Sequence, residues 1–283
     1  MLKQKEYVKK PKWLQLRVQS DANTVNVKNL IKDLHLHTVC NEANCPNRME
    51  CFARRTATFM ILGRNCTRNC TFCNVTRNAP DPVDEKEPEN VGKAVQKLQL
   101  KHAVVTSVTR DDLPDQGANQ FAQIVLQIRK YNPDTTIELL IPDMSGREDL
   151  LDIILQTKPD VLNHNIETIP EFYPKVRPAA NFMRSIAVLG YAKRQGFNTK
   201  SGIMVGFGET ETQVVNAFKE LRKVDCDMLT VGQYLRPTKL HIPVTEYVTP
   251  EQFERYKDIA LNLGFKRVNS GPLVRSSYHA EPI

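Results

Sequence analysis

The chain has 283 residues, of which 41% are hydrophobic and 25% charged, and its mean hydropathy is −0.42. These values exclude an intrinsically disordered chain, which needs fewer apolar residues, and a membrane protein, which needs more. The longest uncharged apolar stretch near the front, residues 56–63, is far shorter than a membrane-spanning helix. The lysine-rich N-terminus is followed by no apolar segment of a secretory signal, so we expect a cytoplasmic protein.

The net charge of +7 favours acidic partners or substrates. The basic residues are spread along the chain and are not gathered with aromatic residues, as a surface that stacks bases would require. We therefore expect neither nucleic acid nor a membrane as a partner.

Strand and helix patterns alternate along most of the chain. Residues 13–39 carry no strong periodicity, cysteines crowd residues 40–73, and the prolines and acidic residues of 79–90 predict an exposed connector. Apolar runs rich in β-branched residues predict six buried strands, at residues 58–62, 103–107, 137–141, 161–165, 201–205 and 228–232. Helical patterns follow these strands, at residues 91–100, 119–131, 148–157, 184–195, 212–223 and 251–263.

This alternation is typical of a parallel α/β sheet, and six units suit either an open, partial barrel or a doubly wound sheet. In both architectures the chemistry lies at the carboxyl ends of the strands.

Six of the seven cysteines lie between Cys40 and Cys73. An odd count in a long chain without an export signal argues against a disulfide framework and favours metal. Cys66, Cys70 and Cys73 directly follow the first predicted strand. Three closely spaced thiolates can ligate three irons of a 4Fe-4S cluster and leave the fourth open for a non-protein ligand. A structural zinc site, with a fourth Cys or His, is the alternative.

The segment from Cys66 to Cys73, CTRNCTFC, resembles the signature of the radical S-adenosylmethionine superfamily, with the aromatic Phe72 before the last cysteine. The resemblance implies that the open iron chelates S-adenosylmethionine and that reduction yields a 5'-deoxyadenosyl radical, chemistry that belongs to the cofactor. It also implies a partial (β/α)6 TIM-type barrel with an N-terminal cysteine-rich extension and a C-terminal extension.

A second cysteine trio, Cys40, Cys45 and Cys51, precedes the first and does not have a standard zinc spacing. Together the two trios resemble the lipoyl synthase family, whose members carry an auxiliary triplet before the radical triplet. A zinc site that adds His35 or His37 as the fourth ligand is the alternative for this trio.

The similarity to this family covers nearly the whole chain. It is carried by residues 57–75 (ATFMILGRNCTRNCTFCNV), 105–113 (VTSVTRDDL), 163–168 (NHNIET), 200–209 (KSGIMVGFGE), 232–237 (GQYLRP) and 271–280 (GPLVRSSYHA). One departure is Gln116, where the family usually has a glycine, and it leaves the conformation of that loop in doubt.

The resemblance also assigns roles to residues near the strand ends. Thr106 to Arg110 would bind the methionyl end of S-adenosylmethionine, and Asn163, Asn165 and Glu167 would grip its ribose, unless they are satisfied core polar groups. Phe72 would pack under the adenine. Glycines of the fifth strand would allow a ligand to approach closely, namely Gly202, Gly206 and Gly208.

The family's Arg-Ser-Ser-Tyr segment occurs as residues 275–278, and the resemblance assigns Ser277 as the fourth ligand of the auxiliary cluster. A serine that merely tethers the tail is the alternative. His164 lies within a strand and reads as a satisfied core histidine. His241 is expected to line the cavity from a loop, and the isolated Cys226 to be an inert buried thiol.

The resemblance implies a sulfurtransferase that inserts two sulfur atoms at C6 and C8 of an octanoyl group on a lipoyl carrier domain. Its cofactors would be two 4Fe-4S clusters and S-adenosylmethionine. The carrier would be the lipoyl domain of a 2-oxoacid dehydrogenase or the glycine cleavage H protein. Further partners would be an electron donor such as flavodoxin or ferredoxin and an iron-sulfur carrier.

We divide the chain into an N-terminal extension with the auxiliary motif (1–52), a barrel core (53–250) and a C-terminal helix and extension (251–283). Two other functions stay open: another radical sulfur-inserting enzyme, such as a biotin synthase or methylthiotransferase, and a zinc-stabilised nucleic-acid-binding module.

Overall fold

The computed structural model describes residues 9–15, 22–278 and 280. An eight-stranded sheet runs in the order β1 to β8, so that each strand pairs with its neighbours in sequence. β1 is antiparallel to β2, and β2 to β8 are all parallel. The strands are β1 (His37–Thr38), β2 (Thr58–Ile61), β3 (His102–Ser107), β4 (Thr136–Leu140), β5 (Val161–Asn163), β6 (Asn198–Val205), β7 (Met228–Gln233) and β8 (Arg267–Gly271).

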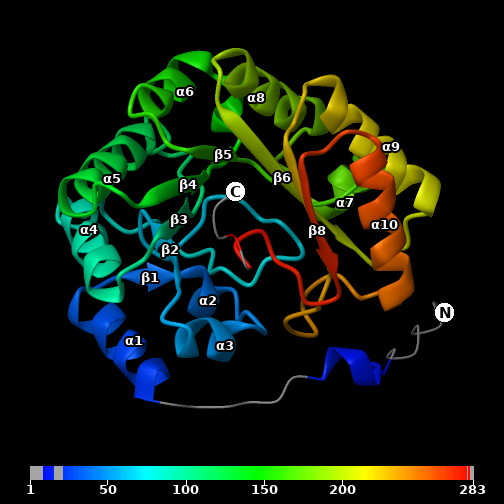
Figure 1. The fold of residues 1–283 in the computed structure, drawn as a ribbon, viewed down its shortest axis with the longest axis horizontal. Helices are drawn as coiled ribbons and strands as arrows, with labels where there is room; N and C mark the ends of the chain where they lie inside the picture. Colours follow the sequence, from blue (N-terminus) through cyan, green and yellow to red (C-terminus); the bar gives the residue numbers. More distant parts are fainter. Residues whose placement is uncertain (1–8, 16–21, 279, 281–283) are drawn as a thin grey trace.

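Helices cover the outside of this curved sheet (Figure 1). The six that alternate with the parallel strands are α4 (Glu87–Leu98), α5 (Ala118–Tyr131), α6 (Glu148–Leu155), α8 (Phe182–Arg194), α9 (Glu211–Lys223) and α10 (Pro250–Asn262). The remaining helices are η1 (Lys12–Leu14), α1 (Ala22–Asp33), α2 (Val39–Glu42), α3 (Arg48–Ala53), η2 (Met144–Gly146), η3 (Pro170–Phe172) and α7 (Tyr173–Val176). The prediction of a partial barrel built from six strand–helix units is confirmed.

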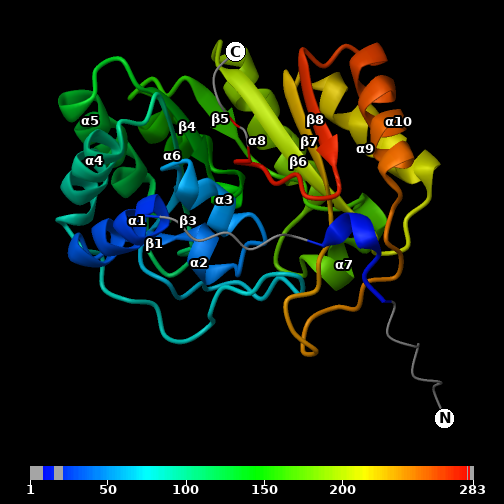
Figure 2. The same cartoon turned by 60° about the horizontal axis from the view of Figure 1, so that its bottom comes forward.

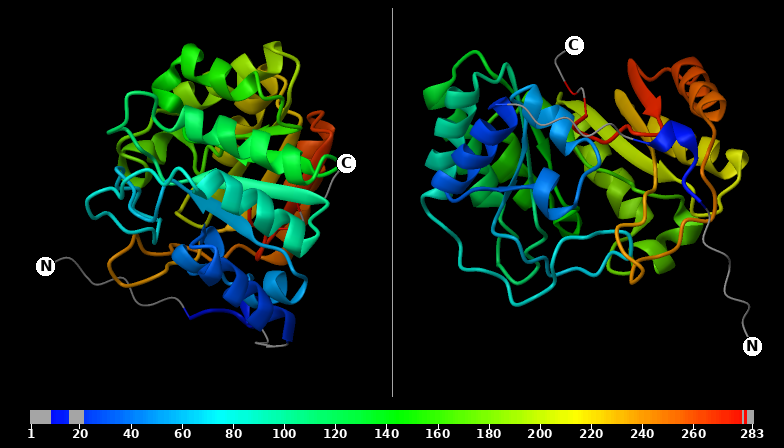
Figure 3. Two further views of the ribbon diagram at one scale, coloured as in Figure 1. Left: turned by 90° about the vertical axis from the view of Figure 1, so that its left-hand side faces the viewer. Right: turned by 90° about the horizontal axis from the view of Figure 1, so that it is seen from below.

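The barrel is open between β1 and β8, and the strand order contains no pairing between them among the described residues. Helices α2 and α3 and the described chain that follows β8 lie at this opening (Figures 1 and 2). The view from below in Figure 3 places α1 to α3 along one side of the sheet and α10 with β8 on the other. No helix in the described part of the chain is long and apolar enough to cross a bilayer.

Local signals explain where the outer helices begin. The Thr210 side chain accepts a hydrogen bond from the backbone of Gln213, whose side chain bonds back to Thr210, so α9 starts with a capping box. Thr249 caps α10, which has Pro250 in its first turn, where a missing N–H does no harm. Asn181 caps α8. These ends agree with the predicted helices to within a few residues.

Two strands and one helix boundary differ from the sequence prediction. β1 is only two residues long, and β8 alternates toward the barrel interior through the polar Arg267 and Asn269. Neither therefore has the apolar run that marks a buried strand. Helix α4 starts at Glu87, inside the segment expected to be an exposed connector. Glu87 is buried because its carboxylate accepts the backbone N–H of Leu62 and the side-chain amide of Gln120.

Apolar side chains between sheet and helices form the core, whereas the barrel interior is polar. Phe59, Leu139 and Phe218 are fully buried in the outer layer, and each stabilises the fold by about 1.5–3 kcal/mol. Inside the barrel, the Lys200 ammonium lies 2.9 Å from one oxygen of Glu138, and both side chains are buried.

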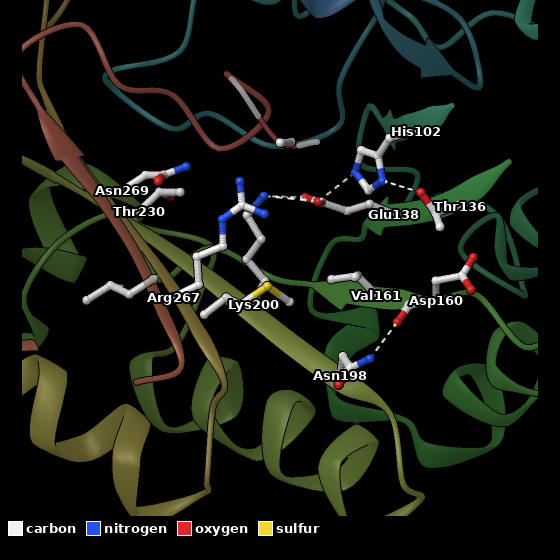
Figure 4. Close-up of a pocket in the computed structure, with 13 residues that line it drawn as sticks. His102, Thr136, Glu138, Asp160, Val161, Asn198, Lys200, Thr230, Arg267 and Asn269 are labelled. Atoms are coloured by element: carbon white, nitrogen blue, oxygen red, sulfur yellow. Dashed lines mark hydrogen bonds and ion pairs between the residues drawn. The ribbon is translucent and has the colours of Figure 1, made fainter. Parts of the chain in front are cut away.

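A cavity of about 200 Å³ lies at the N-terminal ends of the strands (Figure 4). His102 Nε2 lies 3.3 Å from Glu138, and its Nδ1 lies 2.7 Å from the Thr136 hydroxyl. The Asn163 amide also donates to Glu138, over 2.7 Å. Burial acts to raise the pKa of Glu138, but the neighbouring Lys200 and His102 hold it below its usual range. This carboxylate is therefore charged and fully partnered.

Candidate active site

A second, larger cavity of about 500 Å³ lies at the opposite end of the barrel. Its walls come from the length of β2, the carboxyl-terminal parts of β3 to β7, the α2–α3 segment and the chain after β8. Both cysteine trios line it: Cys40, Cys45, Cys51, Cys66, Cys70 and Cys73. All six are free thiols. Folding thus brings together two groups of thiols that the sequence keeps apart.

The loop after β2 carries Cys66, Cys70 and Cys73. The Cys66 thiol accepts the backbone N–H of Thr109 over 3.3 Å, which joins it to the end of β3. The Cys73 N–H donates to the Cys70 carbonyl over 3.2 Å, so that the last turn of the loop is tight. Burial raises the pKa of Cys73 to about 12 and also raises that of Cys70. Metal binding here must therefore release protons.

Arg68, inside this loop, fastens it to the sheet. Its Nε donates to Asp111 over 2.8 Å and its Nη2 to Asp143 over 2.7 Å. The Asp143 side chain is fully buried. Burial acts to raise the pKa of Asp143, but Arg68 holds it below the usual range. The Arg68 guanidinium thus binds Asp111 through two nitrogens and also binds Asp143, which fixes the loop against the ends of β3 and β4.

The second trio comes from two short helices at the barrel opening. Cys40 lies in α2, which the Thr38 hydroxyl caps, and Cys51 lies in α3. Cys45, between them, donates its backbone N–H to the Cys40 carbonyl over 3.2 Å. Burial raises the pKa of Cys40 to about 11 and that of Cys51 to about 12, and neighbouring thiols add to both shifts.

Within the described residues, no three Cys, His, Asp or Glu side chains are arranged to hold a single metal ion. The three thiols of each trio nevertheless line one cavity.

The chain after β8 enters the same cavity and is fixed at several points. The Thr58 hydroxyl donates to Ser277 Oγ over 2.7 Å, and the Thr58 backbone N–H bonds the Cys40 thiol. Ser276 instead exchanges hydrogen bonds with the Asn165 amide over 2.7 and 3.0 Å. The two adjacent serines therefore contact different walls, and Ser277 is the one on the side of the second trio.

The backbone beyond β5 is strained where it enters the cavity. Glu167 has φ of 63°, and it bridges to β6 through bonds with Gly202 and Met204. A non-glycine residue in this region is uncommon, and such strain is often found at functional sites. Asn165 donates to the Glu167 carboxylate over 3.1 Å. Burial raises the pKa of Glu167, and Arg177 opposes that shift.

Four of the predicted cofactor-binding residues line the cavity: Phe72, Thr106, Asn165 and Glu167. Their contacts with a cofactor stay predictions. Three others do not line it. Arg110 is held by Asp112 and the Leu62 carbonyl. Asn163 lies two residues deeper in the barrel, on Glu138. The structure places these two, and Gly206, outside the cavity wall.

Gly206 has φ of 110°, a conformation that favours glycine. A Cβ there would meet the Gln233 amide and the Glu246 carbonyl, so this glycine serves the packing of its own loop.

Sequence reasoning missed Arg177, which is buried and lines the cavity. Its Nη1 donates to the Asn165 carbonyl over 2.9 Å, whereas its Nε is buried with no partner. It lies after α7, in no strand end or motif that would single it out. Arg275, the first residue of the predicted Arg-Ser-Ser-Tyr segment, also lines the cavity, and burial lowers the pKa of its guanidinium while Glu167 opposes that shift.

The remaining predicted residues have clear positions. His164 is buried between the Ile141 carbonyl and the Ser185 hydroxyl, and burial lowers its pKa to about 4, as a core histidine requires. Cys226 is fully buried and its pKa is raised to about 12, in keeping with an inert thiol. His241 contacts the Cys73 carbonyl and is not among the cavity-lining residues.

Comparison with known proteins identifies the class. The model of the radical SAM superfamily matches residues 60–221. The structure of methylornithine synthase is similar with a TM-score of 0.55 at 16% identity, covering 94% of this chain and 86% of that one. Streptococcus suis SuiB bound to S-adenosylmethionine gives a TM-score of 0.60 at 10% identity, covering 74% and 48%. The chain is thus a radical S-adenosylmethionine protein.

The particular family follows from closer relatives. A model described as the N-terminal domain of lipoyl synthase matches residues 1–45. Lipoyl synthase of Caldanaerobacter subterraneus is 55% identical over 277 residues, which cover 97% of this chain and 96% of that protein. Lipoyl synthase of Alkaliphilus metalliredigens is 53% identical over 274 residues, with 96% and 94% covered. The chain belongs to the lipoyl synthase family.

Proposed function

We propose that this protein inserts two sulfur atoms, at C6 and C8, into an octanoyl group that is bound to a lysine of a carrier domain. Each insertion replaces a C–H bond by a C–S bond and uses one S-adenosylmethionine, which becomes methionine and 5'-deoxyadenosine. The observation that carries this proposal is that two separate cysteine trios line one cavity.

The residues fit the groups that the reaction needs. Cys66, Cys70 and Cys73 are free thiols on a fixed loop and would hold the radical cluster. Cys40, Cys45 and Cys51 would hold the auxiliary cluster. When bound, the first cluster with S-adenosylmethionine supplies a radical that removes hydrogen from carbon, and the second supplies sulfide.

The polar groups on the wall suit S-adenosylmethionine. Glu167 and Asn165 present a carboxylate and an amide that can bind a ribose diol. The unpartnered Nε of Arg177 is a buried donor available to a ligand. A volume of about 500 Å³ lies within the range of small-molecule sites. The apolar Phe72 faces the same space and can support a purine ring.

We assign Ser277 as the fourth ligand of the auxiliary cluster. The support is its position, since Thr58 contacts both Ser277 and the Cys40 thiol. Ser276 is engaged by Asn165 on the other wall. Oxygen is a hard ligand for a sulfide-bridged iron, so Ser277 would hold that iron less firmly than the cysteine thiolates would hold theirs. The nearby Arg275 guanidinium would favour the ionised oxygen.

Two cysteine variants separate the half-reactions. Cys70→Ala should abolish reductive cleavage of S-adenosylmethionine, because the radical cluster loses a ligand. Cys45→Ala, with the radical cluster reconstituted, should still form 5'-deoxyadenosine but no lipoyl product. Cys226→Ala is the matched control and should behave as the parent, since Cys226 is buried far from both trios along the chain. Undiminished lipoyl product from Cys45→Ala would contradict the assignment of the sulfur source.

The serine assignment has its own test. Ser277→Ala should lower the iron and sulfide content assigned to the auxiliary cluster and block the second insertion, whereas Ser277→Cys should retain the cluster and slow its loss. Ser276→Ala is the control for a change in the same segment. If Ser277→Ala and Ser277→Cys both turned over like the parent, the ligand role would be wrong.

Metal analysis separates this function from the alternatives. Anaerobically purified protein should contain iron and acid-labile sulfide from two clusters, and zinc without sulfide would favour the nucleic-acid-binding module. A biotin synthase or methylthiotransferase would act on a different substrate and would form no product from an octanoylated carrier. We further propose an electron donor such as flavodoxin or ferredoxin and an iron-sulfur carrier that rebuilds the auxiliary cluster.

A further inference from the structure

The 500 Å³ cavity opens to solvent where the residues that line it are exposed. Among the described residues that line the cavity, the exposed ones are Lys10, Asn44 and Arg236. Lys10 comes from the N-terminal segment and Arg236 from the loop between β7 and α10. A substrate that hangs from another protein must enter where the cavity meets solvent, so its carrier has to sit against these residues.

The loop of residues 235–243 at this mouth is held together by hydrogen bonds among its own residues. Arg236 caps it by donating to the carbonyls of His241, over 2.8 Å, and Lys239. The Thr238 hydroxyl lies 2.9 Å from His241 Nδ1 and accepts the backbone N–H of Leu240. Because these bonds lie within one short loop, its shape does not depend on a partner.

The same loop is fastened to the loop of the radical cysteines. His241 Nε2 lies 3.0 Å from the Cys73 carbonyl, and the Ile242 N–H donates to Thr71 over 3.2 Å. In Figure 2 this segment projects below α7, beyond the carboxyl ends of the strands. A protein bound to this loop would thus have a fixed position relative to the loop of the radical cysteines.

The loop presents an apolar tip among cations. Leu240 is 96% exposed, the most exposed of the large hydrophobic residues in the described chain. Trp13, on the segment that carries Lys10, is also 44% exposed. Residues 9–15 and 235–243 together contain five Lys or Arg and no Asp or Glu.

We propose that Lys10, Arg236, Lys239 and Leu240, here called the rim surface, form the docking site of the acidic carrier domain that presents the octanoyl-lysine. This inference rests on the proposed function. The three cations would attract an acidic partner. Leu240 would become buried on contact and stabilise the complex. A preformed loop also avoids the entropic cost of ordering on contact.

The test compares a whole carrier with a short substrate. The double variant Lys239→Glu/Leu240→Asp changes the rim surface without touching a cavity-lining residue. With octanoylated glycine cleavage H protein, kcat/KM should fall by about tenfold or more, mostly through KM. With an octanoyl-lysine tripeptide, it should change by less than about twofold, because the tripeptide does not reach the rim. The Kd for H protein without the octanoyl group should rise in parallel.

Lys219→Glu/Met183→Asp is the matched control, since both residues are exposed on outer helices and the charge change is the same. It should leave both substrates unaffected. Equal losses for carrier and tripeptide, or an unchanged Kd for the carrier, would overturn the docking site. The docking site would also be overturned if the rim variant altered only the oligomeric state in gel filtration, or only the affinity for RNA. A parent enzyme inactive on both substrates would instead contradict the proposed function.

Discussion

Gly202, in the middle of β6, lies where Asn165 and Ser276 meet, so a substitution there tests the importance of that contact. A Cβ at this position would lie 2.7 Å from Asn165 Oδ1, 2.7 Å from Thr230 Oγ1 and 3.0 Å from Ser276 Oγ. The backbone cannot retreat easily, because its carbonyl accepts the N–H of Glu167 and its strand is paired on both sides. Gly202→Ala must therefore displace the side chains.

The expected size of the effect follows from two opposing contributions. Overpacking costs about 1–3 kcal/mol, and loss of the hydrogen bonds between Asn165 and Ser276 costs roughly 1 kcal/mol more. Alanine regains about 0.5–1 kcal/mol, because glycine is entropically unfavourable in a strand. We expect the free energy of unfolding to fall by about 1–3 kcal/mol and the affinity for S-adenosylmethionine to fall by roughly tenfold.

Urea unfolding gives the first quantity, and anaerobic titration calorimetry of the reconstituted protein gives the second. Gly271→Ala is the matched control, because its Cβ would meet only the Val274 side chain, at 3.3 Å. It should change the unfolding free energy by less than about 1 kcal/mol. Unchanged cofactor affinity in Gly202→Ala would refute the view that the position of Asn165, held by Ser276, matters for S-adenosylmethionine binding.

Three further predictions concern stability. Lys200→Met should lower the unfolding free energy by about 3–5 kcal/mol in urea, because it leaves Glu138 buried without its ammonium partner, and adding Glu138→Gln should restore part of the loss. Burial acts to raise the pKa of Asp227, but Lys193 and Lys266 hold it low, so its stabilisation exists at neutral pH and is lost as pH falls through the folded pKa. The stability gap between the parent and Asp227→Asn should therefore narrow below about pH 4 in denaturant titrations. Gln116→Gly should raise the unfolding free energy by about 1 kcal/mol, since Gln116 has φ of 50°.

Much of the fold could be predicted because strands β2 to β7 consist largely of buried residues, which appear in the sequence as apolar runs. The six apolar runs all became strands. β8 could not be found in this way, since Arg267 and Asn269 face a polar barrel interior. The position of Gln116 agrees with the family's preference for glycine there, because its backbone adopts the left-handed conformation in this chain too.

The cavity wall could be predicted only in part, because sequence marks the end of a strand but not the depth or direction of each side chain. Asn163 and Asn165 point to the same side of β5 and its extension, yet only the later one reaches the cavity. Arg110 follows β3 but turns to Asp112. Arg177 escaped notice because it comes from a connection between short helices, where neither periodicity nor a motif indicates function.

The open edge of the barrel accounts for the presence of two cysteine trios in one site. β1 pairs antiparallel with β2 and so leads the chain toward the amino end of β2, where α2 places Cys40 beside Thr58 and α3 places Cys51. On the other edge β8 ends without meeting β1, and the chain that follows crosses the gap. Ser276 then contacts β5's extension and Ser277 contacts β2. A closed barrel would exclude both the α2–α3 segment and this crossing, and with them the second cysteine trio and the two serines from the cavity wall.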